Sequence, residues 1–167
     1  MAFRAFDVEE VRNLLTYVNR PTTDEYFIAM AILAASRGTC VRRKVGCILT
    51  NSHNHVIATG YNGVAAGQPH CQDKPCPGVG QPSGVGLQSC YALHAEENAL
   101  MQCRDIFQIH TCYTTASPCI NCLRKLLGTS CQRIVFLEEY PHPESRALWV
   151  DDGRSWIQIA AKYLKSS

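Results

Sequence analysis

The stretch TCYTTASPCINCLRKLLGTSCQRIVFLEE, residues 111–139, decides the fold because it holds two strand patterns separated by one helix pattern. Its first residues, TCYTT, and its last, RIVFLEE, are rich in β-branched and aromatic residues, which favours strands. Between them the spacing predicts a helix from Cys119 to about Leu127. A strand, helix and strand in this order predict a sheet with a helix packed on it.

Similar patterns lie on the N-terminal side of this unit. KVGCILTN (residues 44–51) and HVIATGYN (residues 55–62) predict the two strands of a hairpin, with SHN between them as the turn. Helices are predicted from Asp24 to about Ser36 and from His94 to Arg104, and the first of these should be buried because most of its surface is apolar. The whole order predicts helices packed on a mixed sheet.

Both ends of the chain are predicted to be helical. Residues 1–20 form an N-terminal extension, in which Asp7 can cap a helix over residues 7–19. Residues 144–167, ESRALWVDDGRSWIQIAAKYLKSS, are expected to be mostly helical. The apolar stripe of the N-terminal helix consists of Val8, Val11, Leu14, Leu15 and Val18.

Length and composition predict a single soluble domain over residues 1–167. The widest apolar stretch, YFIAMAILAAS, is too short to span a bilayer, so no membrane partner is expected. The N-terminus MAFRAFDVEEVRN has acidic residues where a secretory signal would be apolar, and we therefore expect a cytoplasmic protein. Sixteen basic and fourteen acidic residues leave a formal charge of +2, which argues against a nucleic-acid polymer as partner and is compatible with a small substrate carrying one phosphate.

Ten cysteines are many for a reducing compartment, where structural disulfides are rare. Metal binding or catalysis therefore has to be considered for several of them. The alternative is that free cysteines are small buried apolar residues. Both interpretations stay open for four cysteines within apolar patterns, namely Cys47, Cys103, Cys112 and Cys131.

His94, Cys119 and Cys122 are the residues that point to chemistry. A catalytic zinc uses three protein ligands of the imidazole and thiolate type and leaves a fourth position for water. All three stand at predicted helix starts, where backbone N–H groups and the helix dipole favour thiolates. Glu96 then has no ligand role and is close enough in sequence to act as general acid and base on that water. Taken alone, CINC also fits a thioredoxin-like redox site or a structural zinc site.

The joint pattern narrows these alternatives. H-x-E followed by P-C-x-x-C is the known signature of zinc-dependent nucleobase deaminases, and here it reads HAE from His94 and PCINC from Pro118. From about Asp24 to Tyr140 the chain also resembles the deoxycytidylate (dCMP) deaminase family. The resemblance rests on TCVRRKVGCIL, ATGYNGVAAG, HCQDKPC, HAEENAL, CYTTASPCINC and IVFLEEY, of which RRKVG and GYNG separate this family from other zinc deaminases.

The resemblance implies a fold and a reaction. The fold would be a three-layer α/β/α cytidine deaminase-like domain whose mixed central sheet has about five strands. The reaction would convert dCMP to dUMP and ammonia, a supply of thymidylate precursor, with zinc-bound hydroxide attacking C4 while Glu96 shuttles protons to N3 and to the amine. Asn62 would lie beside the nucleotide, although on the motif alone Asn62 and Gly63 could simply form a turn. Further substrate contacts would be Ser117, Tyr140 and Arg43.

The resemblance also implies regulation and assembly. Members of the family are often hexamers activated by dCTP, with Mg²⁺, and inhibited by dTTP. Lys44, Tyr61 and Gly63 would then contact the effector. The proline that usually follows GYNG is missing here, where the sequence continues GYNGVAAG.

A second, structural zinc is implied for the Cys-rich insert of residues 63–90. Cys40 and Cys71 match ligand positions of the family, and Cys76 and Cys90 are available to complete a four-cysteine site, with His70 as an alternative ligand. Such a site would explain how a long Gly- and Pro-rich loop stays ordered, because metal binding contributes to the free energy of folding.

Two competing functions remain open from the sequence. One is a deaminase with another substrate, such as a modified dCMP, free cytidine or guanine, or a cytosine or adenine in a polynucleotide. The other is an inactive zinc-stabilised interaction or DNA-uptake protein, because a fold does not by itself establish an activity.

Overall fold

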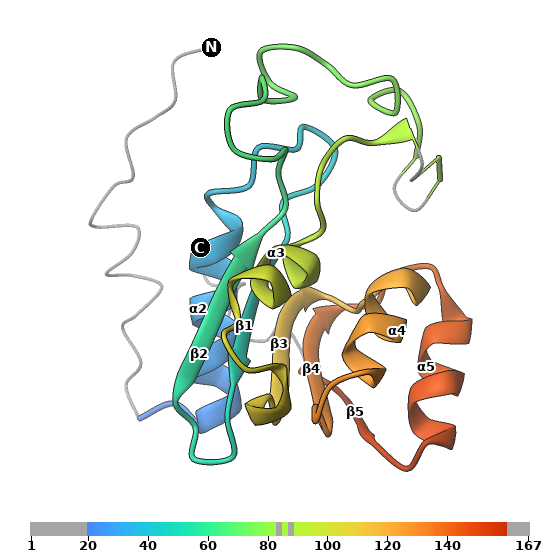
Figure 1. Cartoon of the computed structure of the whole chain (residues 1–167). Coiled ribbons are helices and arrows are strands. Elements are labelled where there is room, and N and C mark those ends of the chain that lie inside the picture. Colours follow the sequence, from blue (N-terminus) through green and yellow to red (C-terminus); the bar gives the residue numbers. More distant parts are fainter. Residues whose placement is uncertain (1–19, 83–84, 87–88, 160–167) are drawn as a thin grey trace.

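The computed structural model describes residues 20–82, 85–86 and 89–159, and its centre is a five-stranded sheet (Figure 1). The strands lie in the order β2-β1-β3-β4-β5. No helix in the described part of the chain is both long and apolar enough to cross a membrane. The strand bounds are β1 Gly46–Thr50, β2 Val56–Tyr61, β3 Thr111–Ala116, β4 Arg133–Glu138 and β5 Ser155–Gln158.

The sheet is mixed, as predicted. β1 pairs antiparallel with both β2 and β3, whereas β3, β4 and β5 run parallel to one another. The predicted hairpin is confirmed, and its turn is held by Asn51, whose Oδ1 accepts hydrogen bonds from the backbone N–H groups of His53 and His55. Asn54 adopts a positive φ of 61°, a conformation that asparagine tolerates better than most residues.

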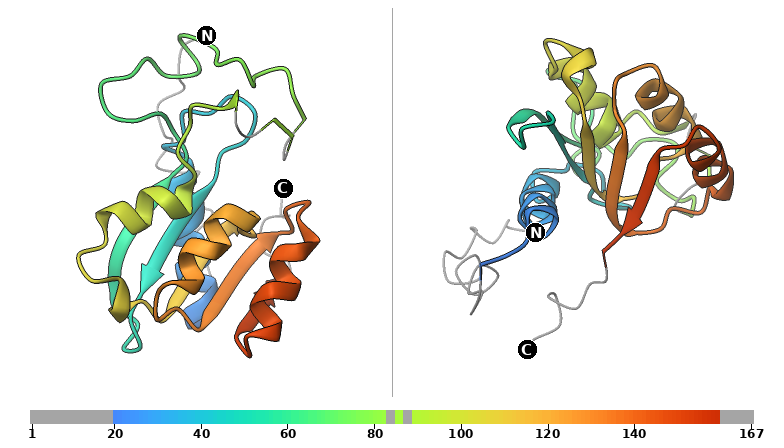
Figure 2. Two further views of the ribbon diagram at one scale, coloured as in Figure 1. Left: turned by 45° about the vertical axis from the view of Figure 1, so that its right-hand side comes forward. Right: turned by 90° about the horizontal axis from the view of Figure 1, so that it is seen from below.

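Helices cover both faces of the sheet and so form three layers (Figure 2). Among the described residues α2 lies alone on one face, where Phe27, Ile28 and Ala31 pack on strand residues such as Tyr113. The other helices cover the opposite face, where Leu123 and Trp149 belong to a second core cluster. The bounds are α2 Thr23–Ala35, α3 Ala95–Gln102, the short 3-10 helix η2 Ile106–Gln108, α4 Ile120–Leu127 and α5 Pro143–Asp151.

The start of α2 is fixed by two sets of polar contacts. Thr22 and Glu25 form a reciprocal capping box that satisfies free backbone N–H groups of the first turn. Asp24 accepts a hydrogen bond from the Tyr113 hydroxyl (2.8 Å) and forms an ion pair with Arg133 (2.9 Å). These contacts tie the helix start to β3 and β4.

The C-terminal region differs from the prediction of a mostly helical segment over residues 144–167. α5 ends at Asp151, and Gly153 has a φ of +78°, a left-handed conformation that stops a helix and that glycine adopts easily. The next residues form β5, whose Trp156 is registered opposite Ile134 of β4. The helix prediction was wrong for Ser155–Gln158 because pairing with an open parallel edge determines this short apolar segment.

Two predicted features lie wholly or partly outside the described residues. The helix expected over residues 7–19 is one, and the last eight residues of the chain are the other. The described parts of the insert at residues 63–90 consist mainly of turns. An isolated β-bridge pairs Gly63, at the start of the insert, with Leu93, just after its end. The bridge closes the loop immediately before His94.

Candidate metal centre and the adjoining pocket

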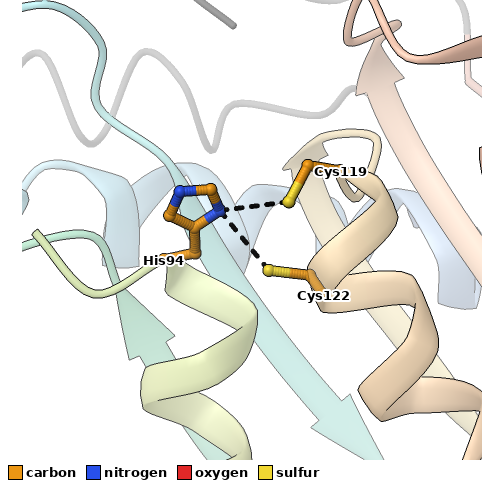
Figure 3. A group of neighbouring side chains, drawn as sticks. All are labelled: His94, Cys119 and Cys122. Atoms are coloured by element: carbon orange, nitrogen blue, oxygen red, sulfur yellow. Dashed lines mark hydrogen bonds between the residues drawn. The ribbon is translucent and has the colours of Figure 1, made fainter. Parts of the chain in front are cut away.

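Three metal-binding side chains meet where α3 and α4 begin (Figure 3). His94 is the N-cap of α3, Cys119 is the N-cap of α4, and Cys122 lies in the first turn of α4. The Nδ1 atom of His94 is 3.5 Å from the Cys119 sulfur and 3.4 Å from the Cys122 sulfur. Within the described ranges this is the one group of His, Cys, Asp or Glu side chains whose ligand atoms all lie within 4.8 Å of one another.

The geometry of this group fits zinc. Tetrahedral zinc with Zn–S distances of about 2.3 Å and Zn–N distances of about 2.0 Å holds nitrogen and sulfur ligands about 3.5 Å apart. The two nitrogen–sulfur distances at His94 agree with that separation. Three ligands of this type also leave one tetrahedral position for another group.

Without a metal ion, only one of the three side chains carries a negative charge that would attract a cation. The pKa of Cys119 falls to about 4, first because the Cys122 thiol hydrogen-bonds to it and also because His94 does so, while burial opposes the shift. The pKa of His94 rises to about 9 because of its hydrogen bond with Cys119. The pKa of Cys122 is raised by its hydrogen bond with Cys119 and by burial. Cys119 is therefore a thiolate at neutral pH, and metal binding would displace protons from the other two residues.

Glu96 is a buried carboxylic acid beside these ligands. Only 4% of the residue is exposed, and it lines the same hollow as His94 and Cys119. Burial raises the pKa of Glu96 from its ordinary 4.5 to about 7, against the attraction of His94. A carboxyl group with a pKa near neutrality can both accept and donate a proton at that pH.

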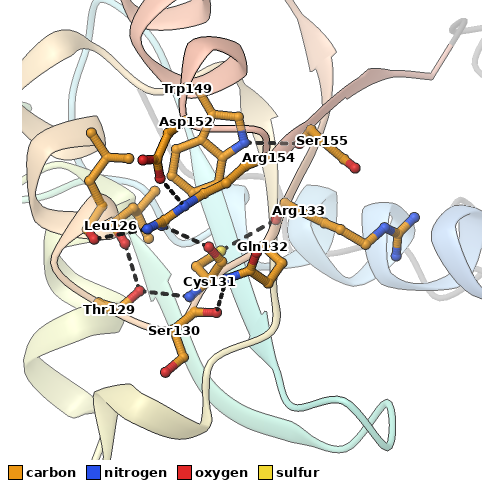
Figure 4. Close-up of polar contacts among 11 residues, drawn as sticks. Leu126, Thr129, Ser130, Cys131, Gln132, Arg133, Trp149, Asp152, Arg154 and Ser155 are labelled. Carbon is orange, nitrogen blue, oxygen red and sulfur yellow. Dashed lines mark hydrogen bonds and ion pairs between the residues drawn. The ribbon is translucent and has the colours of Figure 1, made fainter.

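The far end of α4 is anchored by Arg154 (Figure 4). Its guanidinium donates hydrogen bonds to the carbonyl oxygens of Leu127 (3.2 Å) and Cys131 (2.8 Å), and it forms an ion pair with Asp152 (2.7 Å). The same group lies over the Trp149 ring at 4.9 Å. A cation at the C-terminal end of a helix satisfies free carbonyl groups and interacts favourably with the helix dipole. These contacts fix the helix that carries both thiols.

A pocket opens directly at the metal-binding group. Its hollow, including the open space at its mouth, has a volume of about 570 Å³. Apolar side chains form part of its wall, and a few polar groups converge on it. Its lining consists of Cys40, Arg42, Arg43, Val45, Asn62, Cys90, Ala92, His94, Ala95, Glu96, Ala116, Ser117, Cys119 and Tyr140.

All four residues predicted to contact the substrate line this pocket, and each of them also contacts a neighbouring residue of the pocket wall. Asn62 accepts a hydrogen bond from the Val45 N–H (2.8 Å) and donates one to the Arg43 carbonyl oxygen (2.7 Å). Ser117 Oγ accepts a hydrogen bond from the Tyr140 N–H (2.8 Å). The Arg43 guanidinium lies 5.7 Å from the centre of the Tyr140 ring. Asn62 therefore shapes the pocket wall through the backbone of residues 43–45.

The sequence match that decides the family covers residues 21–138. Over this range the chain matches the model of the cytidine and deoxycytidylate deaminase zinc-binding region. The chain belongs to the cytidine and deoxycytidylate deaminase family. The His94, Cys119 and Cys122 group described above lies within the matched range.

Relatives within this deaminase family carry two kinds of name. The chain is 40% identical to the deoxycytidylate deaminase of Saccharomyces cerevisiae over 72% of its own length and 39% of the yeast protein. It is 38% identical to the deoxycytidylate deaminase of Mycobacterium phage D29 over 73% of its length and 99% of the phage protein. ComE operon protein 2 of Bacillus subtilis is 32% identical over 85% of this chain and 74% of that protein. The match thus spans about two fifths of the yeast relative.

Solved structures confirm that the deaminase fold was predicted correctly. The dCMP deaminase of cyanophage S-TIM5, crystallised with dCMP and dUMP, superimposes with a TM-score of 0.66 at 21% identity, covering 84% of this chain and 99% of that one. The architecture is the cytidine deaminase-like α/β fold around a mixed five-stranded sheet. At this level of identity the likeness concerns the fold alone.

The three residues expected to contact an effector are not among the residues that line the pocket, although each is next in sequence to one that does. Lys44 is exposed just before β1, and Tyr61 ends β2, where its carbonyl oxygen accepts a hydrogen bond from Asn98 Nδ2 (2.9 Å). Gly63 forms the bridge to Leu93. Their role in effector binding stays a prediction.

The cysteines expected to hold a structural zinc are partly gathered. The thiols of Cys71 and Cys76 are 3.7 Å apart. Burial raises the pKa of Cys76, but hydrogen bonds from the Tyr91 and Gly78 backbone and from Cys71 lower it further, so the net pKa lies below its ordinary value of 9.0. In the described part of the insert no three of these thiols lie within 4.8 Å of one another, and His70 is exposed.

Arg42 is a pocket residue that sequence reasoning missed. It donates hydrogen bonds to the carbonyl oxygens of Gly78 (2.7 Å) and Val85 (3.3 Å), and its Nε is buried without a hydrogen-bond partner among the described residues. These partners are 36 and 43 positions away in the sequence. Its only local signal was the neighbouring Arg43, and nothing in RRK separates the two arginines.

Proposed function

We propose that this deaminase-family chain catalyses the hydrolysis of dCMP to dUMP and ammonia, which would supply a thymidylate precursor. The observation that carries the proposal is the His94, Cys119 and Cys122 group sharing one pocket with the buried Glu96. The names of the yeast and phage relatives support dCMP as the substrate.

The residues of the pocket account for the proton transfers of this reaction. A zinc ion held by His94, Cys119 and Cys122 would lower the pKa of a coordinated water toward neutrality. Glu96, with its pKa of about 7, takes a proton from the water and gives it to N3 of the cytosine. It then carries a proton to the amine that leaves C4. Water supplies the oxygen of dUMP, and ammonia is the second product.

Two arginines support a phosphate on the substrate. Arg42 and Arg43 both line the pocket, and the Tyr140 ring lies beside Arg43. Arg43 also forms an ion pair with Glu138, whose side chain is 71% exposed. Because an exposed ion pair contributes little to stability, a substrate phosphate can replace Glu138 as the partner of Arg43 at little cost in free energy. We assign the nucleotide phosphate to this arginine side and the cytosine to the side of Glu96, with Asn62 and Ser117 shaping the wall between them.

The Cys-rich insert is assigned to a second, structural zinc held by Cys40, Cys71, Cys76 and Cys90, with His70 as the alternative ligand. The short distance between the Cys71 and Cys76 thiols supports it, as do the backbone hydrogen bonds that lower the pKa of Cys76. Burial of Cys40, Cys71 and Cys76 is also typical of closed zinc sites. Zinc binding would draw the four thiols together.

We also assign the chain to a homo-oligomer, a hexamer, that dCTP with Mg²⁺ activates and dTTP inhibits through Lys44, Tyr61 and Gly63. The resemblance to the deoxycytidylate deaminase family supports this assignment, because members of that family are often regulated in this way. A sigmoidal dependence of rate on dCMP that becomes hyperbolic with dCTP, together with the mass of the assembly, would test it.

The experiment that tests the function is ammonia release from zinc-loaded protein given dCMP, cytidine, dCTP or a short cytosine-containing single-stranded DNA. Turnover of dCMP alone supports the proposal, and activity on the oligonucleotide alone would contradict it. No ammonia release from any of the four substrates would favour an inactive interaction protein or a deaminase of a modified nucleotide.

The variant Glu96→Gln supplies the matched test of mechanism. Its kcat should fall by about 10²–10⁴-fold, the usual contribution of a general acid and base. The variant should keep its zinc, because Glu96 is not a ligand. Metal content and rate are measured on the same sample. Unchanged turnover in this variant would show that the mechanism is wrong.

A further inference from the structure

The helix that follows the imidazole ligand, α3, is held mainly by the sheet, whereas α4 contacts α5 and places Leu123 and Leu126 in the core. α3, whose N-cap is His94, packs against β2 and β1, and its direct contacts with α4 are sparse. The distance between His94 and the two thiols therefore depends on the sheet and on whatever links the helices directly. Figure 3 shows the two helix starts facing each other across the ligand group.

Glu97 provides such a link through its two carboxylate oxygens. Oε2 accepts a hydrogen bond from the backbone N–H of His94 (3.0 Å), which fixes the N-cap residue of α3. Oε1 accepts a hydrogen bond from the Lys125 ammonium group of α4. Lys125 is three residues after Cys122 and therefore nearly one helical turn away. One side chain thus connects the imidazole ligand to the helix of the thiolate ligands.

We propose that Glu97 is a positioning residue for the metal centre and acts together with Lys125. By joining the backbone of His94 to α4, it keeps the imidazole at the distance from both sulfurs that tetrahedral zinc requires. The inference rests on the proposed zinc site but not on the identity of the substrate. Glu97 has no place in the proton transfers assigned to Glu96.

The contribution of the Glu97–Lys125 pair should be visible in the binding of zinc rather than in the free energy of unfolding. An exposed ion pair contributes little to global stability, and the Lys125 side chain is 51% exposed. Residues that orient metal ligands from outside the coordination sphere commonly change metal affinity by 10- to 100-fold. We therefore expect the loss of Glu97 to accelerate zinc release about tenfold.

The test is the rate of zinc release from the zinc-loaded full chain into excess chromogenic chelator, without substrate. Glu97→Ala should release the zinc of the His94 site about tenfold faster than the wild type. Glu97→Gln keeps an oxygen for the His94 N–H but loses the charge, and Lys125→Met loses the same ion pair from the other helix. These two variants should accelerate release equally and by less than Glu97→Ala.

Glu25→Ala is the matched control, because Glu25 closes the same kind of capping box on α2, away from the metal. It should lower the melting temperature without changing zinc release. Release at the wild-type rate in Glu97→Ala, or equal acceleration in Glu25→Ala, would overturn the proposal. An enzyme inactive on dCMP that still shows the expected release rates would overturn only the proposed function.

Discussion

At the scale of single residues, Glu96 carries a conflict between stability and chemistry. A buried carboxylate without a metal beside it is costly, because burial disfavours the charged form. The rise of its pKa to about 7 reflects this cost. A zinc ion in the neighbouring site would offset it through its positive charge.

Replacing Glu96 by a side chain that has no charge at any pH should therefore stabilise the metal-free protein, but only above about pH 4.5. Below pH 4.5 the carboxyl is protonated in both states and costs nothing; between pH 4.5 and 7 only the unfolded chain releases the proton, so stability falls as pH rises. Above pH 7 the full cost of about 3 kcal/mol applies. We expect metal-free Glu96→Gln to match the wild type in urea unfolding at pH 4 and to exceed it by up to that amount at pH 8. A difference that does not change with pH would contradict this.

Single residues also show what a sequence can and cannot predict about a site. That His94, Cys119 and Cys122 meet, with Glu96 beside them, could be predicted because fixed local spacing and helix starts identify these residues. Arg42 was not, because its partners Gly78 and Val85 reach it only through the path of the insert. Glu97 was visible as the third residue after an N-cap, but its bond to Lys125 required knowing that α3 and α4 are neighbours.

At the scale of elements, the close approach of α2 to β1 depends on Gly46. A Cβ atom there would lie 2.0 Å from the Ala31 carbonyl oxygen and 2.5 Å from the Ala35 nitrogen, both backbone atoms of α2. Backbone cannot move aside as a flexible side chain could. The helix can lie this near the sheet only because the strand has no side chain at that position.

Gly46→Ala should therefore destabilise the fold by about 3 kcal/mol, the upper range for overpacking a core. Gly80→Ala is the matched control, because a Cβ atom at Gly80 meets nothing within 4 Å. Urea unfolding of the two variants at one pH compares them directly. Equal stability of both variants would show that α2 does not depend on Gly46.

Elements also differ in how far their sequences determine them. β3 and β4 were predicted almost to the residue, because β-branched and aromatic residues run through both segments. β5 was missed because SWIQ is short and follows a helix, so its strand conformation comes from pairing with β4. Local propensity predicts an element well only where it agrees with the tertiary contacts.

At the scale of the whole molecule, the proposed second zinc makes a prediction about metal content. Purified wild-type protein should hold two zinc ions per chain, and Cys71→Ser should hold one, because a closed site needs its ligands. Cys103→Ser is the control, since the Cys103 thiol bonds the Asp105 carbonyl oxygen, outside both sites. The zinc content of the three purified proteins tests this prediction. One zinc ion per chain in the wild type would show that there is no second site.

The order of the strands has a consequence for how the molecule is made. Apart from the exchange of β1 and β2, the strands lie across the sheet in the order in which a ribosome produces them. Each strand after the hairpin can therefore join the same free edge, and none has to enter between two that are already paired. His94, Cys119 and Cys122 all precede β4. His94, Cys119 and Cys122 can thus come together, and could take up a metal ion, before the last two strands have joined the sheet.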